Sequence, residues 1–183
     1  MRVREVVWVS YKPQGVEHCT VKGGNSGWAL EGTLVRRFRG GTAMVTYKIE
    51  TDPRWRTKSL SVEQILQGRR RALEIEAKGH RWFKGGKELV ALKGCTDVDL
   101  TASPVTNTLP IKRRRLKVGA STEVKAAWVT FPSLKVIPLH QRYQRLGPRS
   151  YRYRSAGGFT AVIEVDDFGL VRRYGNLWAA VGP

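Results

Sequence analysis

The sequence predicts an all-β fold with minor helix, in which an antiparallel meander forms a sandwich or an incomplete or closed β-barrel. Three observations favour this fold: apolar and polar residues alternate with a period of two, turn signals recur about every ten residues, and helix signals are sparse. No linker, repeat or low-complexity tract divides the chain, so residues 1–183 are expected to form a single domain.

The alternation is clearest in the segments 43–49, 73–76 and 151–154, where one face is apolar or aromatic. Turn signals such as Gly40–Gly41 and Gly157–Gly158 separate these segments. A barrel of about ten or more such strands would leave room inside for more than side chains. The residues expected to form its apolar wall are Val45, Tyr47, Leu73, Ile75, Val129, Ile163 and Val165. The period alone does not decide whether Trp128 or Val129 faces inward.

One segment, Ser61–Arg71, is compatible with two structures. It reads either as a helix that begins at an N-cap Ser61 or as a strand that ends in a turn at Gly68. Because other helix signals are weak, less than about a fifth of the residues should be helical, which is below the average for globular proteins.

The composition excludes a disordered chain and predicts a strongly electropositive surface. Hydrophobic residues make up 41% of the 183 residues, and the net charge is +18. Such a surface attracts phosphate-bearing or acidic partners, among them nucleic acid, anionic membrane surfaces and acidic sugars. The charge alone does not distinguish these partners.

Cysteine usage and the N-terminus favour a cytoplasmic protein. Cys19 and Cys95 are too few for a secreted disulfide framework, so both thiols are expected to be free. The apolar stretch Val6–Val9 is shorter than the roughly 7–15 residues of a secretory signal. No apolar run approaches the roughly 20 residues of a transmembrane helix.

The segment Gly94–Leu116 is polar where the rest of the chain alternates. If it is a strand, Asp97 and Asp99 face the same side together with Cys95. The following basic run, Lys112–Arg115, can supply counter-charge to the two carboxylates. Between them, Thr106–Thr108 is typical of a structural corner or of a ligand contact. The two aspartates could therefore accept hydrogen bonds from ligand hydroxyls, bind a metal ion, or form an internal salt-bridge cluster with the basic run.

Several ordered motifs resemble a bacterial protein family that is named for glycolipid binding. The most specific is Thr106–Arg113, which reads TNTLPIKR, although Lys112 stands where arginine is commoner. The other motifs are Gly15–His18, Asp52–Thr57, Gly94–Leu100, Ala127–Pro132, Gln141–Tyr143, Tyr151–Tyr153 and Val165–Val171. The resemblance implies an incomplete antiparallel β-barrel, similar to that of lipoprotein-localisation factors, with an apolar cavity.

The first functional hypothesis is that the protein is not an enzyme and holds a lipid, a glycolipid or another amphiphilic small molecule in its cavity. The candidate ligand-binding residues are Asp97, Asp99, Asn107, Arg113, Trp55, Trp128 and Glu17. The first four are expected to converge at one end of the cavity, where they would hold a head group. No catalytic residue, metal ligand or cofactor is expected, because the two cysteines and three histidines lack zinc-ligand spacing and no nucleophile or phosphate-loop motif occurs.

Two alternative hypotheses come from other functional classes. The basic runs Arg69–Arg71 and Lys112–Arg115 could bind nucleic acid through their charge. The alternation of Tyr151–Arg154 argues against this, because tyrosines and arginines on opposite faces of a strand cannot share one ligand. An enzyme that uses the Asp97 and Asp99 pair is the third hypothesis. Glu17 and His18 do not form an acid–base pair on a strand, since adjacent residues point to opposite faces.

Overall fold

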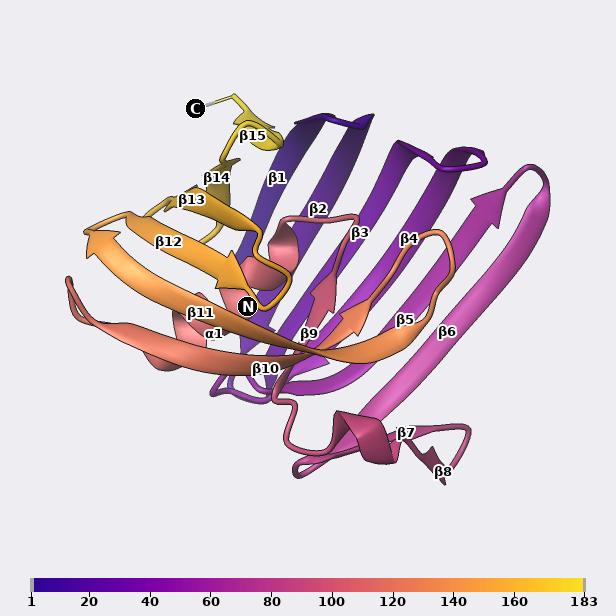
Figure 1. Cartoon of the computed structure of the whole chain (residues 1–183), viewed down its shortest axis with the longest axis horizontal. Helices are drawn as coiled ribbons and strands as arrows, with labels where there is room; N and C mark the ends of the chain where they lie inside the picture. The colour runs from indigo at the N-terminus through magenta and orange to yellow at the C-terminus, as the bar shows by residue number, and fades with distance from the viewer. Residues whose placement is uncertain (1, 183) are drawn as a thin grey trace.

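The computed structural model describes residues 2–182 and consists mainly of one strongly curved sheet (Figure 1). Strands hold 63% of the residues and helices 7%, which confirms the prediction of a β-rich chain with little helix. The elements are β1 Arg2–Tyr11, β2 Gln14–Gly24, β3 Gly27–Phe38, β4 Gly41–Thr51, β5 Thr57–Leu66, β6 Arg69–Lys78, β7 Arg81–Lys84, β8 Lys87–Glu88, η1 Val90–Leu92, β9 Asp97–Leu100, η2 Val105–Asn107, α1 Thr108–Arg114, β10 Ser121–Val129, β11 Val136–Gly147, β12 Ser150–Ser155, β13 Thr160–Val165, β14 Val171–Tyr174 and β15 Trp178–Val181.

The sheet contains 15 strands in the order β8-β7-β6-β5-β4-β3-β2-β1-β15-β14-β13-β12-β11-β10-β9. Two antiparallel meanders, β1–β8 and β10–β15, join where β1 pairs with β15. The pairing of β9 with β10 is parallel, and β8 and β9 form the two edges. The sheet is therefore the incomplete form of the predicted barrel, since hydrogen bonds do not close it.

Curvature brings the edge strand β9 back to the start of β5. The N–H of Thr57 donates to the carbonyl oxygen of Thr96 at 3.3 Å, and the hydroxyl of Thr57 accepts from the N–H of Val98 at 3.2 Å. In Figure 1, the β10–β12 strands pass in front of the β1–β6 part of the sheet, and the segment from β9 to α1 lies between them. This segment belongs to the stretch Gly94–Leu116, which the sequence singled out as polar.

Burial follows the predicted alternation, with one correction. The seven residues expected to form an apolar cavity wall are all buried, with exposed fractions of 0–5%. However, they pack in the hydrophobic core and do not line the apolar cavity described below. The interior of the curved sheet is therefore filled by side chains over much of its length, as close packing requires.

The ambiguous segment Ser61–Arg71 is a strand pair. β5 ends at Leu66, the turn residues Gln67 and Gly68 have positive φ angles of 51° and 73°, and β6 begins at Arg69. Within β5, Leu60, Val62 and Gln64 are buried in alternation, which is the period of a strand.

The expected corner at Thr106–Thr108 is instead the start of a short helix. η2 leads directly into α1, and Pro110 lies in the first turn of α1. Proline is tolerated there, because backbone N–H groups of the first turn make no hydrogen bond within the helix. Lys112, Arg113 and Arg114 lie in the last turn, where cations complement the helix dipole, and Arg115 ends the helix with a φ of 45°. Within residues 2–182, no helix is long and apolar enough to span a bilayer.

Candidate functional site

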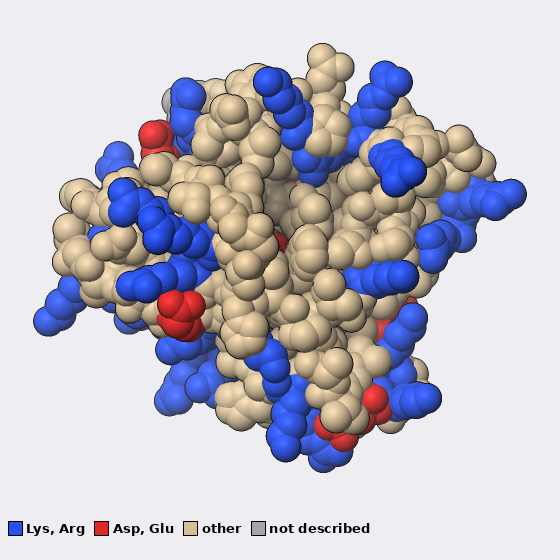
Figure 2. Space-filling model, viewed as in Figure 1, with Lys and Arg blue, Asp and Glu red and all other residues tan. Residues whose placement is uncertain are grey.

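An apolar cavity of about 430 Å³ lies where β9–β12 approach β3 and β15. This volume falls within the usual range for small-molecule sites, roughly 300–1,000 Å³. The main apolar side chains in its wall are Leu100, Trp128, Leu139, Phe159, Leu177 and Trp178. The main polar ones are Arg36, Asp99, Ser103 and Asn107. In Figure 2, the face towards the viewer is mainly neutral around a central hollow, and Lys and Arg gather towards the periphery.

Asp99 is held at the cavity by two neighbours. Its carboxylate accepts hydrogen bonds from the hydroxyl of Thr106 at 3.0 Å and from the side-chain amide of Gln141. Burial raises the pKa of Asp99 to about 6, and the two hydrogen bonds act against that rise. Because Thr106 also accepts from the N–H of Leu100, the carboxylate is tied to the first turn of η2.

Asn107 is held by the aromatic residues beside the cavity. The hydroxyl of Tyr143 donates to the Asn107 Oδ1 at 2.8 Å, and the Asn107 Nδ2 donates to the carbonyl of Pro104 at 3.1 Å. Tyr143 packs edge-on against Tyr153, with ring centroids 5.2 Å apart. Desolvation raises the pKa of Tyr143 well above its usual value, so the phenol remains a hydrogen-bond donor.

Glu17 lies behind the cavity wall. Its side chain is 0% exposed, and its Oε1 accepts from the hydroxyls of Tyr47 and Ser103. Tyr47 reaches it by crossing Gly32, where a Cβ would stand 2.3 Å from the phenol ring. Burial raises the pKa of Glu17 to about 8, although both hydrogen bonds favour the charged form. Since Ser103 lines the cavity, Glu17 supports the wall and does not form part of it.

Arg36 brings a buried cation to the same wall. Its side chain is over Trp178, with Cζ 4.8 Å from the ring centroid, and it donates to the carbonyl of Thr101 at 3.1 Å. Gly15 makes room for it, because a Cβ there would stand 2.8 Å from the Arg36 Cγ. Desolvation lowers the pKa of Arg36 to about 10, and the carboxyl of Glu17 acts in the opposite direction. Arg36 Nε and Glu17 Oε2 are buried without a hydrogen-bond partner in the described chain.

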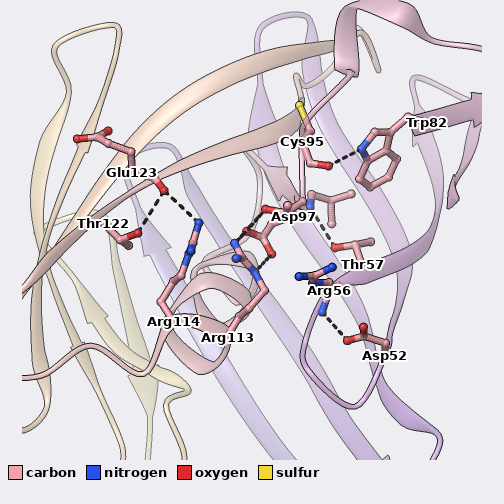
Figure 3. Close-up of polar contacts among 12 residues, drawn as sticks. Asp52, Arg56, Thr57, Trp82, Cys95, Asp97, Arg113, Arg114, Thr122 and Glu123 are labelled. Atoms are coloured by element: carbon pink, nitrogen blue, oxygen red, sulfur yellow. Dashed lines mark hydrogen bonds and ion pairs between the residues drawn. The ribbon is translucent and has the colours of Figure 1, made fainter. Parts of the chain in front are cut away.

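Asp97 and Arg113 form a buried ion pair. Arg113 Nε donates to Asp97 Oδ1 at 3.0 Å, and its terminal nitrogen donates to Asp97 Oδ2 and to the Thr96 hydroxyl. The side chains of Arg113 and Asp97 are only 9% and 1% exposed. Burial raises the pKa of Asp97, and the facing guanidinium acts against this rise. Figure 3 shows Arg113 turned towards Asp97 from α1. Of the three roles that the sequence allowed for the aspartates, Asp97 therefore takes the internal salt bridge with the basic run.

The four residues expected to converge at one end of the cavity are divided between two places. Asp99 and Asn107 line the apolar cavity, whereas Asp97 does not and Arg113 lines a different hollow. The reason is that Arg113 neutralises Asp97, while Asp99 is held by neutral partners. The predicted proximity of the two aspartates on one strand therefore does not produce a shared carboxylate site.

The two candidate tryptophans also separate. Trp128 lines the cavity, and its neighbour Val129 is fully buried in the core. Trp55 lies in the loop between β4 and β5, with a φ of 66°. It stacks on Trp28 at 4.5 Å and lines the same hollow as Arg113.

Sequence reasoning missed Arg36, Ser103 and Gln141. Arg36 and Gln141 are buried on β3 and β11, and each is flanked in sequence by two exposed residues. A polar residue at an inward position of an alternating strand is the signal that could have identified both. Ser103 carries no such signal, because it lies in the irregular stretch before η2.

Comparisons with known proteins agree with this architecture. The family described as "Putative glycolipid-binding" matches residues 5–180. The crystal structure of a DUF1089 family protein from Pseudomonas aeruginosa is similar to this chain, with a TM-score of 0.83 and 30% sequence identity, over 90% of this chain and 91% of that one. None of the curated proteins compared matches significantly. Since the family match covers nearly all the described residues, the chain belongs to the family described as "Putative glycolipid-binding".

Proposed function

We propose that the protein binds an amphiphilic molecule, with a glycolipid as the best-supported class, in the apolar cavity. The observation that carries this proposal is the composition of the cavity wall. Trp128, Leu139 and Trp178 offer contact area for an alkyl chain or a sugar face, and each buried methylene contributes about 0.8 kcal/mol. The polar lining comes from β3 and from the segment between β9 and α1.

The polar part of the wall suits hydroxyl and ether groups. Asp99 and Asn107 are fixed by their own neighbours and can accept or donate hydrogen bonds without rearrangement. Arg36 also lines the cavity, and a guanidinium can donate hydrogen bonds to ligand oxygens. The family's name adds support for a glycolipid, since sugar head groups carry these oxygens.

We propose binding in preference to catalysis by the aspartates. Asp97 is engaged by Arg113, and Asp99 by Thr106 and Gln141. Two carboxylates with separate partners are poorly placed to act as an acid–base pair on one substrate.

Replacement of Leu139 by Gln is expected to weaken binding of dodecyl maltoside monomers by about tenfold, because a polar amide would replace apolar wall. Binding can be followed by tryptophan fluorescence, since Trp128 and Trp178 line the cavity. Val162→Gln, at an exposed position on β13, is the matched control and should retain the affinity of the unsubstituted protein. Equal affinities for all three proteins, or tight binding of maltose alone, would contradict the proposal.

We also propose that the protein works in a reducing compartment, the cytoplasm. The buried, unpaired thiols of Cys19 and Cys95 support this. Titration of the denatured but unreduced protein is expected to detect both thiols. Desolvation raises the pKa of both buried thiols, that of Cys95 to about 11, so neither thiol should react before unfolding. A titration that detects no thiol would be inconsistent with this compartment.

A further inference from the structure

A second hollow, of about 370 Å³, is lined almost entirely by cationic residues. We call it the basic hollow; its lining residues are Pro53–Arg56 of the β4–β5 loop and Lys112–Arg115 at the end of α1. No carboxylate lines it, and it shares no lining residue with the apolar cavity. An inference about the basic hollow therefore does not depend on the proposed function of that cavity.

The cations of the basic hollow lack acidic partners. Arg113 is neutralised by Asp97, but Arg54, Arg56, Lys112, Arg114 and Arg115 take part in none of the ion pairs found in residues 2–182. Some exposed arginines elsewhere do pair with carboxylates, as Arg81 does with Glu88 and Arg149 with Asp167. Asp166 and Asp97 do act on Lys112 and Arg114 through their charge, but neither forms an ion pair with them.

Contacts of the β4–β5 loop and of Lys112 fix part of the basic hollow. Asp52 Oδ1 accepts the backbone N–H groups of Arg54 and Arg56, at 2.8 and 2.9 Å, which fixes the loop. The Lys112 ammonium lies 4.2 Å from the centroid of Phe168 and 5.6 Å from that of Trp55. Figure 3 shows Arg56 and Arg114 on either side of the Asp97–Arg113 pair, in the order Arg114, Arg113, Arg56. The loop backbone and the Lys112 ammonium are therefore held in place, while the side chains of Arg54, Arg56, Arg114 and Arg115 are exposed.

Holding these cations together has an electrostatic cost. Desolvation and the charge of Arg115 lower the pKa of Lys112, and desolvation and the charge of Arg113 lower the pKa of Arg114. A bound anion would reverse the repulsive part of both effects. Phosphate suits the site, because arginine forks donate paired hydrogen bonds to its oxygens and lysine adds a point charge.

We propose that the basic hollow binds a phosphate group, carried either by a lipid head group or by a soluble phosphate compound. A concave site formed by two short segments encloses one or two phosphates, whereas a nucleic-acid backbone would need a longer track of charge. The proposed phosphate-binding residues are Arg54, Arg56, Lys112, Arg114 and Arg115. Arg113 also lines the basic hollow, but Asp97 neutralises its charge.

Calorimetric titration of the full chain with inorganic pyrophosphate tests the proposal. Saturable binding is expected, and Arg54→Gln/Arg56→Gln should weaken it by about tenfold through the loss of charge-assisted hydrogen bonds. Arg37→Gln/Arg39→Gln removes the same charge at exposed positions outside the basic hollow and should change the affinity by less than about twofold. Thermal melts of both variants check that each is folded.

Sedimentation with vesicles distinguishes the two sources of phosphate. Binding to phosphatidylcholine vesicles that contain phosphatidic acid, lost in Arg54→Gln/Arg56→Gln, would assign the site to a lipid head group. Pyrophosphate binding without vesicle binding would assign it to a soluble phosphate compound. The proposal is overturned if neither probe binds, if both double variants weaken binding equally, or if a single-stranded oligonucleotide binds more tightly than pyrophosphate through the same residues.

Discussion

Replacement of Asp97 by Asn is expected to lower the free energy of unfolding by about 3–5 kcal/mol. The substitution keeps the shape of the side chain and removes its charge. The Arg113 guanidinium, whose side chain is only 9% exposed, then has no counter-ion. Removing one member of a buried pair is costly because the remaining charge stays desolvated. Urea unfolding at neutral pH measures the change, and dodecyl maltoside affinity should stay constant because Asp97 does not line the apolar cavity.

Two further variants separate the loss of the pair from a general effect of losing an aspartate. Asp167 pairs with Arg149 at the surface, where its side chain is 81% exposed, so Asp167→Asn should cost less than about 1 kcal/mol. The double change Asp97→Leu/Arg113→Met removes both charges and should recover most of the stability lost in Asp97→Asn. If Asp97→Asn costs no more than Asp167→Asn, the buried pair contributes nothing beyond a surface pair.

The fold could be predicted from the sequence because its signal is local. Alternation at Ala43–Ile49 and at Tyr151–Arg154 reports burial directly, and the structure confirms it: the tyrosines are 4% exposed, while Arg154 is exposed. The edge position of β9 and its parallel pairing with β10 could not be read in this way. They depend on the path of the irregular segment between β9 and α1, which carries no periodic pattern.

The site was predicted only in part because its geometry depends on long-range contacts. Asp99 and Asn107 were identified, yet their partners Gln141 and Tyr143 come from β11, far along the chain. Residues two apart on a strand face the same side, so the sequence placed Asp97 together with Asp99. This spacing cannot tell which of the two carboxylates pairs with an arginine. Glu17 was predicted to bind ligand, but the sequence did not indicate its neighbours Tyr47 and Ser103, which lie on distant elements.

Glu17 is expected to make the stability of the protein fall as the pH rises from 4.5 to 8. Burial raises its pKa from 4.5 to about 8 in the folded state, so folding retains a proton that the unfolded chain loses. Each pH unit in this window then costs about 1.4 kcal/mol, which gives a total loss of about 3–5 kcal/mol. The stabilising contribution is complete below pH 4.5 and is lost as the pH passes through the folded pKa.

Glu17→Gln should remove this dependence, because an amide keeps the size of the side chain and does not titrate. Urea unfolding of both proteins across pH 4.5–8 should show the variant gaining stability relative to the unsubstituted protein as the pH rises. Glu74→Gln, at an exposed position on β6, is the matched control and should leave the slope unchanged. Parallel curves for the unsubstituted protein and Glu17→Gln would mean that Glu17 titrates alike in the folded and unfolded chains. In that case, the hydrogen bonds from Tyr47 and Ser103 would fully offset the cost of burying its charge.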